Sequence, residues 1–93
     1  MNLGEIRSQI DEVDSGMISL LSIRAKLVFA ASELKKDERD VRAPERVEQV
    51  IRNIRRKADA SGLDPDIAER VYRTLIDCFI AQELQKYEGK NGT

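Results

Sequence analysis

The chain has 93 residues with 41 % hydrophobic and 4 % aromatic side chains, which suits one small domain, residues 1–93, with an aliphatic core. Its 16 basic and 17 acidic residues leave a net charge of −1, which gives no electrostatic basis for binding nucleic acid. Histidine is absent and cysteine occurs once, which excludes Ser-His-Asp and Cys-His catalysis, most zinc sites and an internal disulfide, so we expect no metal and no cofactor.

The N-terminal part of the chain predicts one long helix, because it lacks proline and its apolar side chains recur at heptad spacing. A helix of about 36 residues spans ~54 Å, whereas a compact domain of this length is roughly 30 Å across. Two shorter helices cannot cover such a seam, so we predict a two-fold homodimer built on the long helices. The two apolar rows are Leu3, Ile10, Met17, Arg24 and Ala31, and Ile6, Val13, Leu20, Leu27 and Leu34.

The rest of the chain predicts a loop and two more helices. The charged stretch DERDVRAP reads as a loop that ends at Pro44, a residue suited to the first turn of a helix. Gly62 fits a C-terminal cap, and Asp64 followed by Pro65 is a helix start signal. No signal pattern and no apolar run of ~20 residues is evident, which favours a cytoplasmic protein. The predicted fold is all-α, with helices over about 3–38, 44–60 and 64–87 and a polar tail over 88–93.

Two cations interrupt the apolar pattern of the first helix. Arg24 lies within an apolar row, and Lys35 follows 11 residues later. In one continuous helix this spacing is about 20° beyond three full turns, so both side chains would project from one side, ~16 Å apart. An unpaired guanidinium is costly to desolvate, so we favour an anionic ligand for Arg24 over an ion pair with Glu33 or Asp14. The alternative for Lys35 is a solvated lysine at a helix C-terminus.

Arg7 is a candidate for the same site only through a second chain. It precedes Arg24 by 17 residues, which places it about 100° away around the helix and ~25 Å along it. The two side chains cannot reach one small ligand from a single straight helix. In an antiparallel dimer, however, Arg7 of one chain could approach Arg24 of the other.

Two more charged residues lie beside predicted apolar stripes. Arg46 is next to Val47, and the alternative to a ligand-binding role for it is a salt bridge with Glu45 or Asp40. Glu83 falls in line with Phe79 and Tyr87 on the third helix, where a carboxylate is either paired with a cation or protonated. Several cations and one carboxylate in an all-helical interior would suit a small dianionic ligand.

Six short stretches of the chain are IRSQIDEVD, LLSIRAKLV, SELKK, APERV, GLDPD and LIDCFIAQEL. In order and spacing they resemble the all-helical chorismate mutases, especially the branch that contains the isochorismate pyruvate lyases. The resemblance covers residues 3 to about 87. It implies an intertwined homodimer of three-helix chains, in which the long first helices pair and two active sites form.

The resemblance also implies roles for the candidate residues. Arg7 would enter the partner's site and hold a substrate carboxylate, and Arg24 would hold a carboxylate in its own chain's site. Lys35 would contact the ether oxygen and a carboxylate, and Arg46 would complete the polar lining. Glu83 stands where the bacterial enzymes usually carry a glutamine that donates to the ether oxygen. Chorismate rearranges to prephenate through one cyclic transition state, which needs positioning and electrostatic stabilisation rather than a nucleophile.

Three positions depart from the usual mutase pattern. Val47 stands where many mutases have a glutamate, and Ala43 replaces a nearby aspartate. Both changes resemble the isochorismate pyruvate lyase branch. Glu83 departs from both branches and can donate to the ether oxygen only when protonated, so we predict that activity falls as pH rises. An ionised Glu83 would repel a dianion but tolerate an ammonium group.

The favoured hypothesis is therefore a chorismate mutase. The alternatives are an isochorismate pyruvate lyase that forms salicylate and pyruvate, and a mutase of amino-substituted chorismate. A helical dimerisation module without chemistry is the non-enzymatic alternative, in which Arg24 would form a buried ion pair that fixes register. The predicted loop over 37–42 lies between Lys35 and Arg46, so we expect it to order when a ligand binds.

Overall fold

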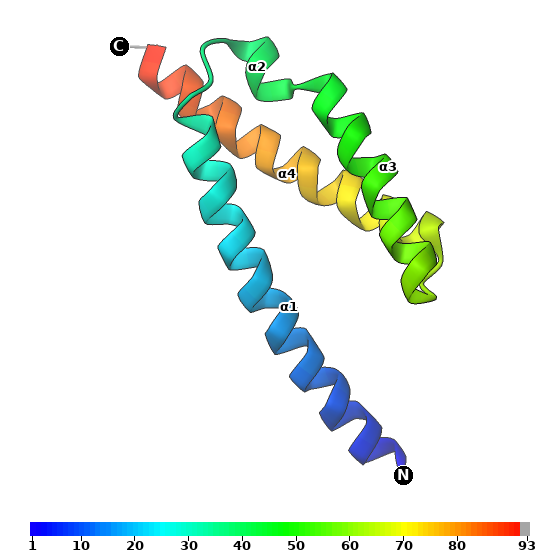
Figure 1. Cartoon of the computed structure of the whole chain (residues 1–93). Helices are drawn as coiled ribbons and strands as arrows, with labels where there is room; N and C mark the ends of the chain where they lie inside the picture. Colours follow the sequence, from blue (N-terminus) through cyan, green and yellow to red (C-terminus); the bar gives the residue numbers. More distant parts are fainter. Residues whose placement is uncertain (92–93) are drawn as a thin grey trace. The chain divides into compact units, whose positions relative to one another are not determined.

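The computed structural model describes residues 1–91 of the chain, with side chains through residue 88, and every regular element in that range is helical (Figure 1). This confirms the all-α fold. The chain divides into two compact units, residues 1–33 and the residues from Leu34 onward. The four helices are α1 (Leu3–Ser32), α2 (Glu38–Arg42), α3 (Pro44–Ser61) and α4 (Pro65–Asn91).

Helix α1 begins where predicted but ends six residues earlier than residue 38. Its N-cap is Asn2, whose side-chain oxygen accepts a hydrogen bond from the backbone N–H of Glu5 at 2.8 Å. In the last turn the Ser32 hydroxyl donates to the carbonyl of Phe29 at 2.6 Å. Such a local side-chain bond competes with continuation of the helix.

Two aspartates complete the break after α1. Asp37 caps the next helix by accepting from the N–H of Asp40 at 2.8 Å, and the Asp40 carboxylate accepts from the N–H of Lys36 at 3.1 Å. Lys35 therefore lies between helices. The expectation that Arg24 and Lys35 project from one side of a continuous helix was wrong.

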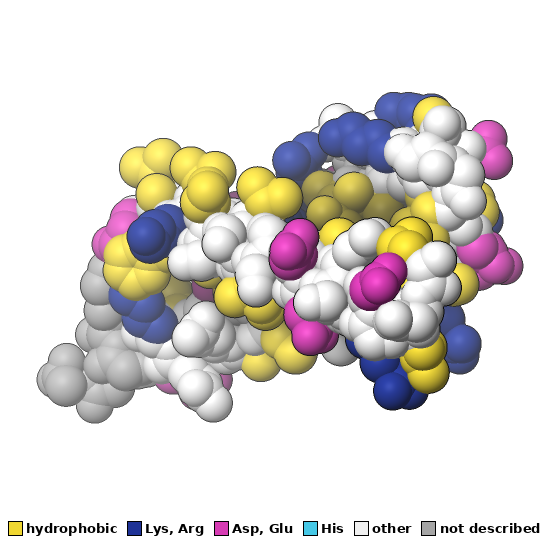
Figure 2. All heavy atoms as spheres, turned by 90° about the horizontal axis from the view of Figure 1, so that it is seen from below, with side chains coloured by type: hydrophobic (Ala, Val, Ile, Leu, Met, Phe, Trp, Pro, Cys, Tyr) yellow, Lys and Arg dark blue, Asp and Glu magenta, His cyan; other side chains and the backbone are white. Residues whose placement is uncertain are grey.

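None of residues 3–32, all of which the structure describes, is buried within the chain. The predicted seam is largely in contact with solvent, with Leu20 at 68 % and Leu27 at 67 % exposure. Figure 2 shows large hydrophobic side chains on the molecular surface. By length and composition α1 could cross a bilayer, but a core helix of a soluble protein passes the same test.

The segment predicted as a loop contains the short helix α2. Val41 anchors it, because this side chain is only 4 % exposed and apolar burial offsets the cost of ordering the turn. Ala43 then joins α2 to α3 in the left-handed region, with φ 40°. An alanine there is strained, since its Cβ crowds the backbone. Pro44 begins α3 as predicted.

Helices α3 and α4 form an antiparallel hairpin around a small aliphatic core. Gly62 ends α3 with φ 79°, a conformation that glycine adopts without strain. The Asp64 carboxylate accepts from the N–H of Asp66 at 2.9 Å, so both predicted signals at this turn are confirmed. The buried side chains in the hairpin are Ile51, Ala58, Ala68 and Ile76.

The polar C-terminal segment does not leave the helix at residue 87. Helix α4 continues to Asn91, so the predicted tail over 88–93 was wrong as far as that residue. Polar residues stay helical while the backbone bonds persist, and one glycine weakens a helix by about 1 kcal/mol without ending it. Residues 92–93 lie outside the described residues.

Candidate active site

Lys35 and Glu83 form an ion pair, with 2.9 Å between Nζ and Oε2. Their side chains are 24 % and 9 % exposed, so the pair is largely removed from solvent. Glu83 lies two turns beyond the buried Ile76 on α4, which directs its side chain to the inward face. The structure confirms that Glu83 pairs with a cation. The alternative of a solvated Lys35 was wrong.

The pair fixes a cationic donor at a defined point within the unit that begins at Leu34. A charge-assisted hydrogen bond is stronger than a neutral one, and it restricts an otherwise flexible lysine side chain. Each ion offsets the desolvation cost of the other. The Lys35 ammonium therefore stands ready to bind an incoming oxygen anion, provided that the ligand compensates for the bond to Glu83.

Arg46 does not make either salt bridge expected of it. Its Nη1 donates to the side-chain oxygen of Gln49 at 2.7 Å on the exposed face of α3. Glu45 pairs instead with Arg39, which belongs to α2. Arg46 is thus held along its own helix, where a ligand can compete for it at little cost.

Val47 lies on the wall of an open groove of about 500 Å³ between α3 and α4. Its lining combines apolar side chains with the charged Arg42, Glu48 and Asp77. Ala43 lies four residues before Val47, at the left-handed junction between α2 and α3. Of the candidate residues only Val47 is among those that line the groove, which are Arg42, Pro44, Val47, Glu48, Asp77, Ile80, Ala81 and Leu84.

Arg7 and Arg24 both belong to the unit of residues 1–33. Arg7 is exposed and Arg24 is partly buried. Because α1 is unbroken from Leu3 to Ser32, their predicted separation of ~25 Å along one helix applies. One small ligand cannot bridge them within a chain. Their roles stay predictions.

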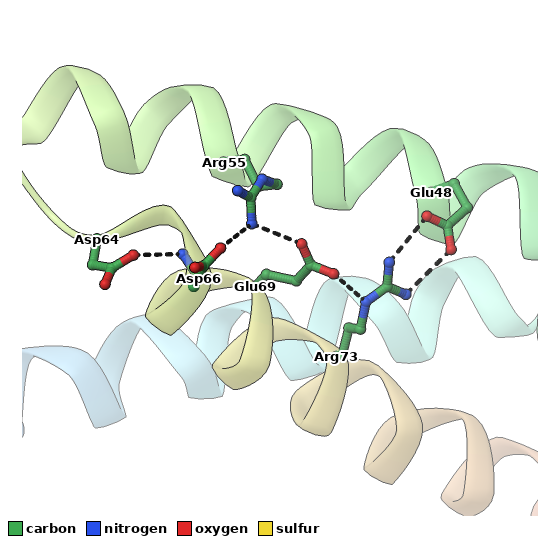
Figure 3. A network of polar contacts seen from close by, with 6 residues as sticks. All are labelled: Glu48, Arg55, Asp64, Asp66, Glu69 and Arg73. Atoms are coloured by element: carbon green, nitrogen blue, oxygen red, sulfur yellow. Dashed lines mark hydrogen bonds and ion pairs between the residues drawn. The ribbon is translucent and has the colours of Figure 1, made fainter.

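A chain of ion pairs along the contact between α3 and α4 was not anticipated from the sequence (Figure 3). Arg55 contacts Asp66 and Glu69, and Arg73 contacts Glu69 and Glu48. Hydrogen bonds from Arg73 are the largest cause that holds the pKa of Glu48 and of Glu69 below its usual value. The i,i+4 spacing of Glu69 and Arg73 was the available signal.

Residues 6–84 match the model of the chorismate mutase type II family, and the chain belongs to that family. It is 32 % identical over 90 residues to the isochorismate pyruvate lyase of Pseudomonas aeruginosa, covering 97 % of this chain and 89 % of that one. It is 28 % identical over 93 residues to the chorismate mutase of Methanocaldococcus jannaschii, covering 96 % and 94 %. It is 35 % identical over 75 residues to the T-protein of Enterobacter agglomerans, covering 80 % of this chain but only 20 % of that one.

Family membership supports an enzyme, an isomerase with a chorismate-like substrate. The all-helical architecture and the absence of histidine agree with this class, because its chemistry needs no side-chain nucleophile. Both mutase and lyase names occur among the relatives, so the family alone does not choose between the two reactions.

Proposed function

We propose that this protein is a chorismate mutase that converts chorismate to prephenate. In one cyclic step the ether C–O bond breaks while a C–C bond forms, so no atom is gained or lost. The observation that carries the proposal is the inward Lys35–Glu83 pair, which holds a cationic donor largely away from solvent. Negative charge develops on the ether oxygen in the transition state, and a preorganised donor there lowers the barrier.

Glu83 would hold Lys35 in place before the substrate binds. When substrate binds, Lys35 turns from the Glu83 carboxylate to the ether oxygen and a substrate carboxylate. An ionised carboxylate at this position repels the dianion, whereas a neutral amide would donate a second hydrogen bond to the ether oxygen. Glu83→Gln should therefore be at least as active as the wild-type protein. A Glu83→Gln variant with much lower kcat/KM would contradict this role.

The active assembly would be an intertwined homodimer. The support is the apolar seam of α1, which the single chain leaves exposed. A bilayer is the less favourable environment, because Arg24 and Lys26 lie within the apolar part of α1 and charges are costly there. We therefore place the protein in the cytoplasm, with Arg7 contributed to the partner's site and Arg24 to its own.

Mixing two inactive variants tests the shared site. In a heterodimer of Arg7→Ala and Lys35→Met, one site carries both changes and the other carries neither. Random exchange then restores about a quarter of the wild-type activity, because half of the dimers are mixed and each has one intact site. No recovery after proven subunit exchange would place Arg7 outside the partner's site.

A second candidate function is isochorismate pyruvate lyase. Two observations favour it: the nearly full-length relative of that name, and Ala43 and Val47 at positions where many mutases have acidic residues. That reaction also proceeds through a cyclic transition state, in which ether cleavage accompanies transfer of a ring hydrogen to the departing pyruvate. The same Lys35 would stabilise the developing charge.

Product analysis with chorismate and isochorismate, each at about pH 5 and about pH 7.5, decides between the two functions. Prephenate from chorismate supports the mutase. Salicylate with pyruvate from isochorismate, and little prephenate, supports the lyase. If neither turns over, amino-substituted chorismate is the next substrate to assay.

For a dimerisation module without chemistry, Arg24→Ala would change assembly, whereas in an enzyme it would remove ligand binding from an intact dimer.

A further inference from the structure

The guanidinium of Arg73 uses all three of its nitrogens. Nη1 and Nη2 donate to the two carboxylate oxygens of Glu48 at 3.2 Å and 3.1 Å. Nε donates to Glu69 at 2.7 Å. A planar group bound at three points has a fixed orientation, which the point charge of a lysine cannot reproduce. Arg73 thus connects α3 to α4 with defined geometry.

The position of this contact matters because Glu48 adjoins the candidate site residues. It follows Val47 directly on α3 and lies on the wall of the same groove. On α4, Arg73 lies ten residues before Glu83, about 15 Å along one helix. The ion-pair chain in Figure 3 ends at Glu48. The last link therefore joins the start of α3 to the helix that carries Glu83.

We propose that Arg73 is a positioning residue, which acts through Glu48 to hold the first turns of α3, with Arg46 and Val47, against α4. The proposal rests on the proposed function for its effect on activity. Its effect on the helix itself does not depend on any substrate. Surface ion pairs usually contribute little, and a bidentate arginine within a network is the recognised exception.

Arg55 provides a matched control within the same network. Its side chain is 40 % exposed, as is that of Arg73, and it also makes two ion pairs. However, it binds Asp66 and Glu69 near the turn, and it lies eight residues, about 12 Å, beyond Val47. Loss of either arginine removes ion pairs to two carboxylates, but only loss of Arg73 releases Glu48.

The experiment compares Arg73→Gln, Arg73→Lys and Glu48→Gln with Arg55→Gln. The full-length chain is assayed for kcat and KM, and backbone hydrogen exchange is measured over residues 44–50. We expect kcat to fall about tenfold in Arg73→Gln and Arg73→Lys, since a misplacement of about 1 Å can cost about 10²-fold and a smaller one costs less. Exchange over 44–50 should rise in both. Arg55→Gln should leave kcat and that exchange unchanged, even if its unfolding midpoint falls equally.

A double variant separates positioning from general loss of stability. If Arg73 acts through Glu48, the variant Glu48→Gln/Arg73→Gln loses no more kcat than Arg73→Gln alone. Equal effects of the Arg73 and Arg55 variants on kcat and on exchange would overturn the proposal. If wild-type protein converts neither substrate, the proposed function fails, and the exchange over 44–50 still decides whether Arg73 positions α3.

Discussion

Helix α1 and the α3–α4 hairpin solve the problem of apolar surface in opposite ways. The hairpin buries Ile51, Ala58 and Ile76 within the chain and joins its two helices by ion pairs. Helix α1, whose residues are all described, buries no side chain. The hairpin therefore has a small core of its own, whereas α1 has the pattern of a core helix and the exposure of a surface helix.

This difference indicates where a second chain would pack in the proposed dimer. Apolar surface on the scale of the α1 seam is normally covered in a soluble assembly. Several ion pairs between residues distant in the sequence, including Lys35–Glu83, lie in the unit that begins at Leu34. The single chain can thus preform one part of the site, and assembly would supply the rest.

The largest expected effect comes from a charge placed in the α1 seam. Leu27→Asp should dissociate the dimer, because two copies lose burial of about 1.5–3 kcal/mol each and two carboxylates would be desolvated. Sedimentation and far-UV circular dichroism would show monomers that keep the helices of the hairpin. Ser19→Asp, on an exposed polar position of the same helix, is the control. A Leu27→Asp protein that remained dimeric would show that the seam is not the interface.

The next largest effect should come from Lys35, the cation of the candidate site, which lies in the unit that begins at Leu34. Lys35→Met should lower kcat by about 10²–10³-fold, because it removes a preorganised donor to the ether oxygen. Assembly should not change, since Lys35 is outside the α1 seam. Lys36→Met is the matched control on an exposed neighbour. Equal kcat values for the two variants would remove Lys35 from the proposed mechanism.

A smaller effect is expected at the left-handed junction before α3. Ala43→Gly relieves a strain of about 1–2 kcal/mol and adds unfolded-state entropy worth about 0.4–1 kcal/mol, so the net stabilisation should be about 0–1.6 kcal/mol. Ala60→Gly, in the last turn of α3 where the backbone is still right-handed, should destabilise by up to about 0.5–1 kcal/mol. Urea unfolding would measure both. Opposite signs are the result that supports strain at Ala43.

The smallest effect should come from acid titration of the ion pairs on the hairpin. The pKa values of Glu48 and Glu69 are lowered in the folded chain from 4.5, chiefly by hydrogen bonds from Arg73. A carboxylate whose pKa is lower in the folded chain stabilises the fold at pH values above its ordinary pKa. This stabilisation is lost as pH falls through the folded-state pKa. The urea midpoint should therefore fall between about pH 5 and about pH 3. Glu69→Gln should reduce that fall, and an unchanged profile would count against these pairs.

The sequence predicted the long elements well because their signals are local. Pro44, Gly62 and Asp64 act through their own backbone geometry, so the bounds of α3 and the start of α4 could be placed within a residue or two. The end of α1 could not, because it depends on Asp37 and Asp40 capping a helix that the charged composition did not indicate.

The site was predictable only in part. Pairing of Glu83 with a cation was one of two alternatives that a carboxylate in an apolar stripe left open, and the identity of its partner depended on the break after Ser32. Contacts between distant segments, such as Arg73 with Glu48, have no local signal at all. The roles of Arg7, Arg24 and Arg46 remain predictions, since they require a ligand or a second chain.

The largely exposed seam of α1 also has a consequence for mass action. If two seams must meet to exclude water, folding of α1 and subunit association are one equilibrium, and its position depends on total protein concentration. Thermal midpoints should rise with concentration, and specific activity should decline on dilution as sites that span two chains come apart. A cell would then set the fraction of competent sites through the amount of this protein it synthesises.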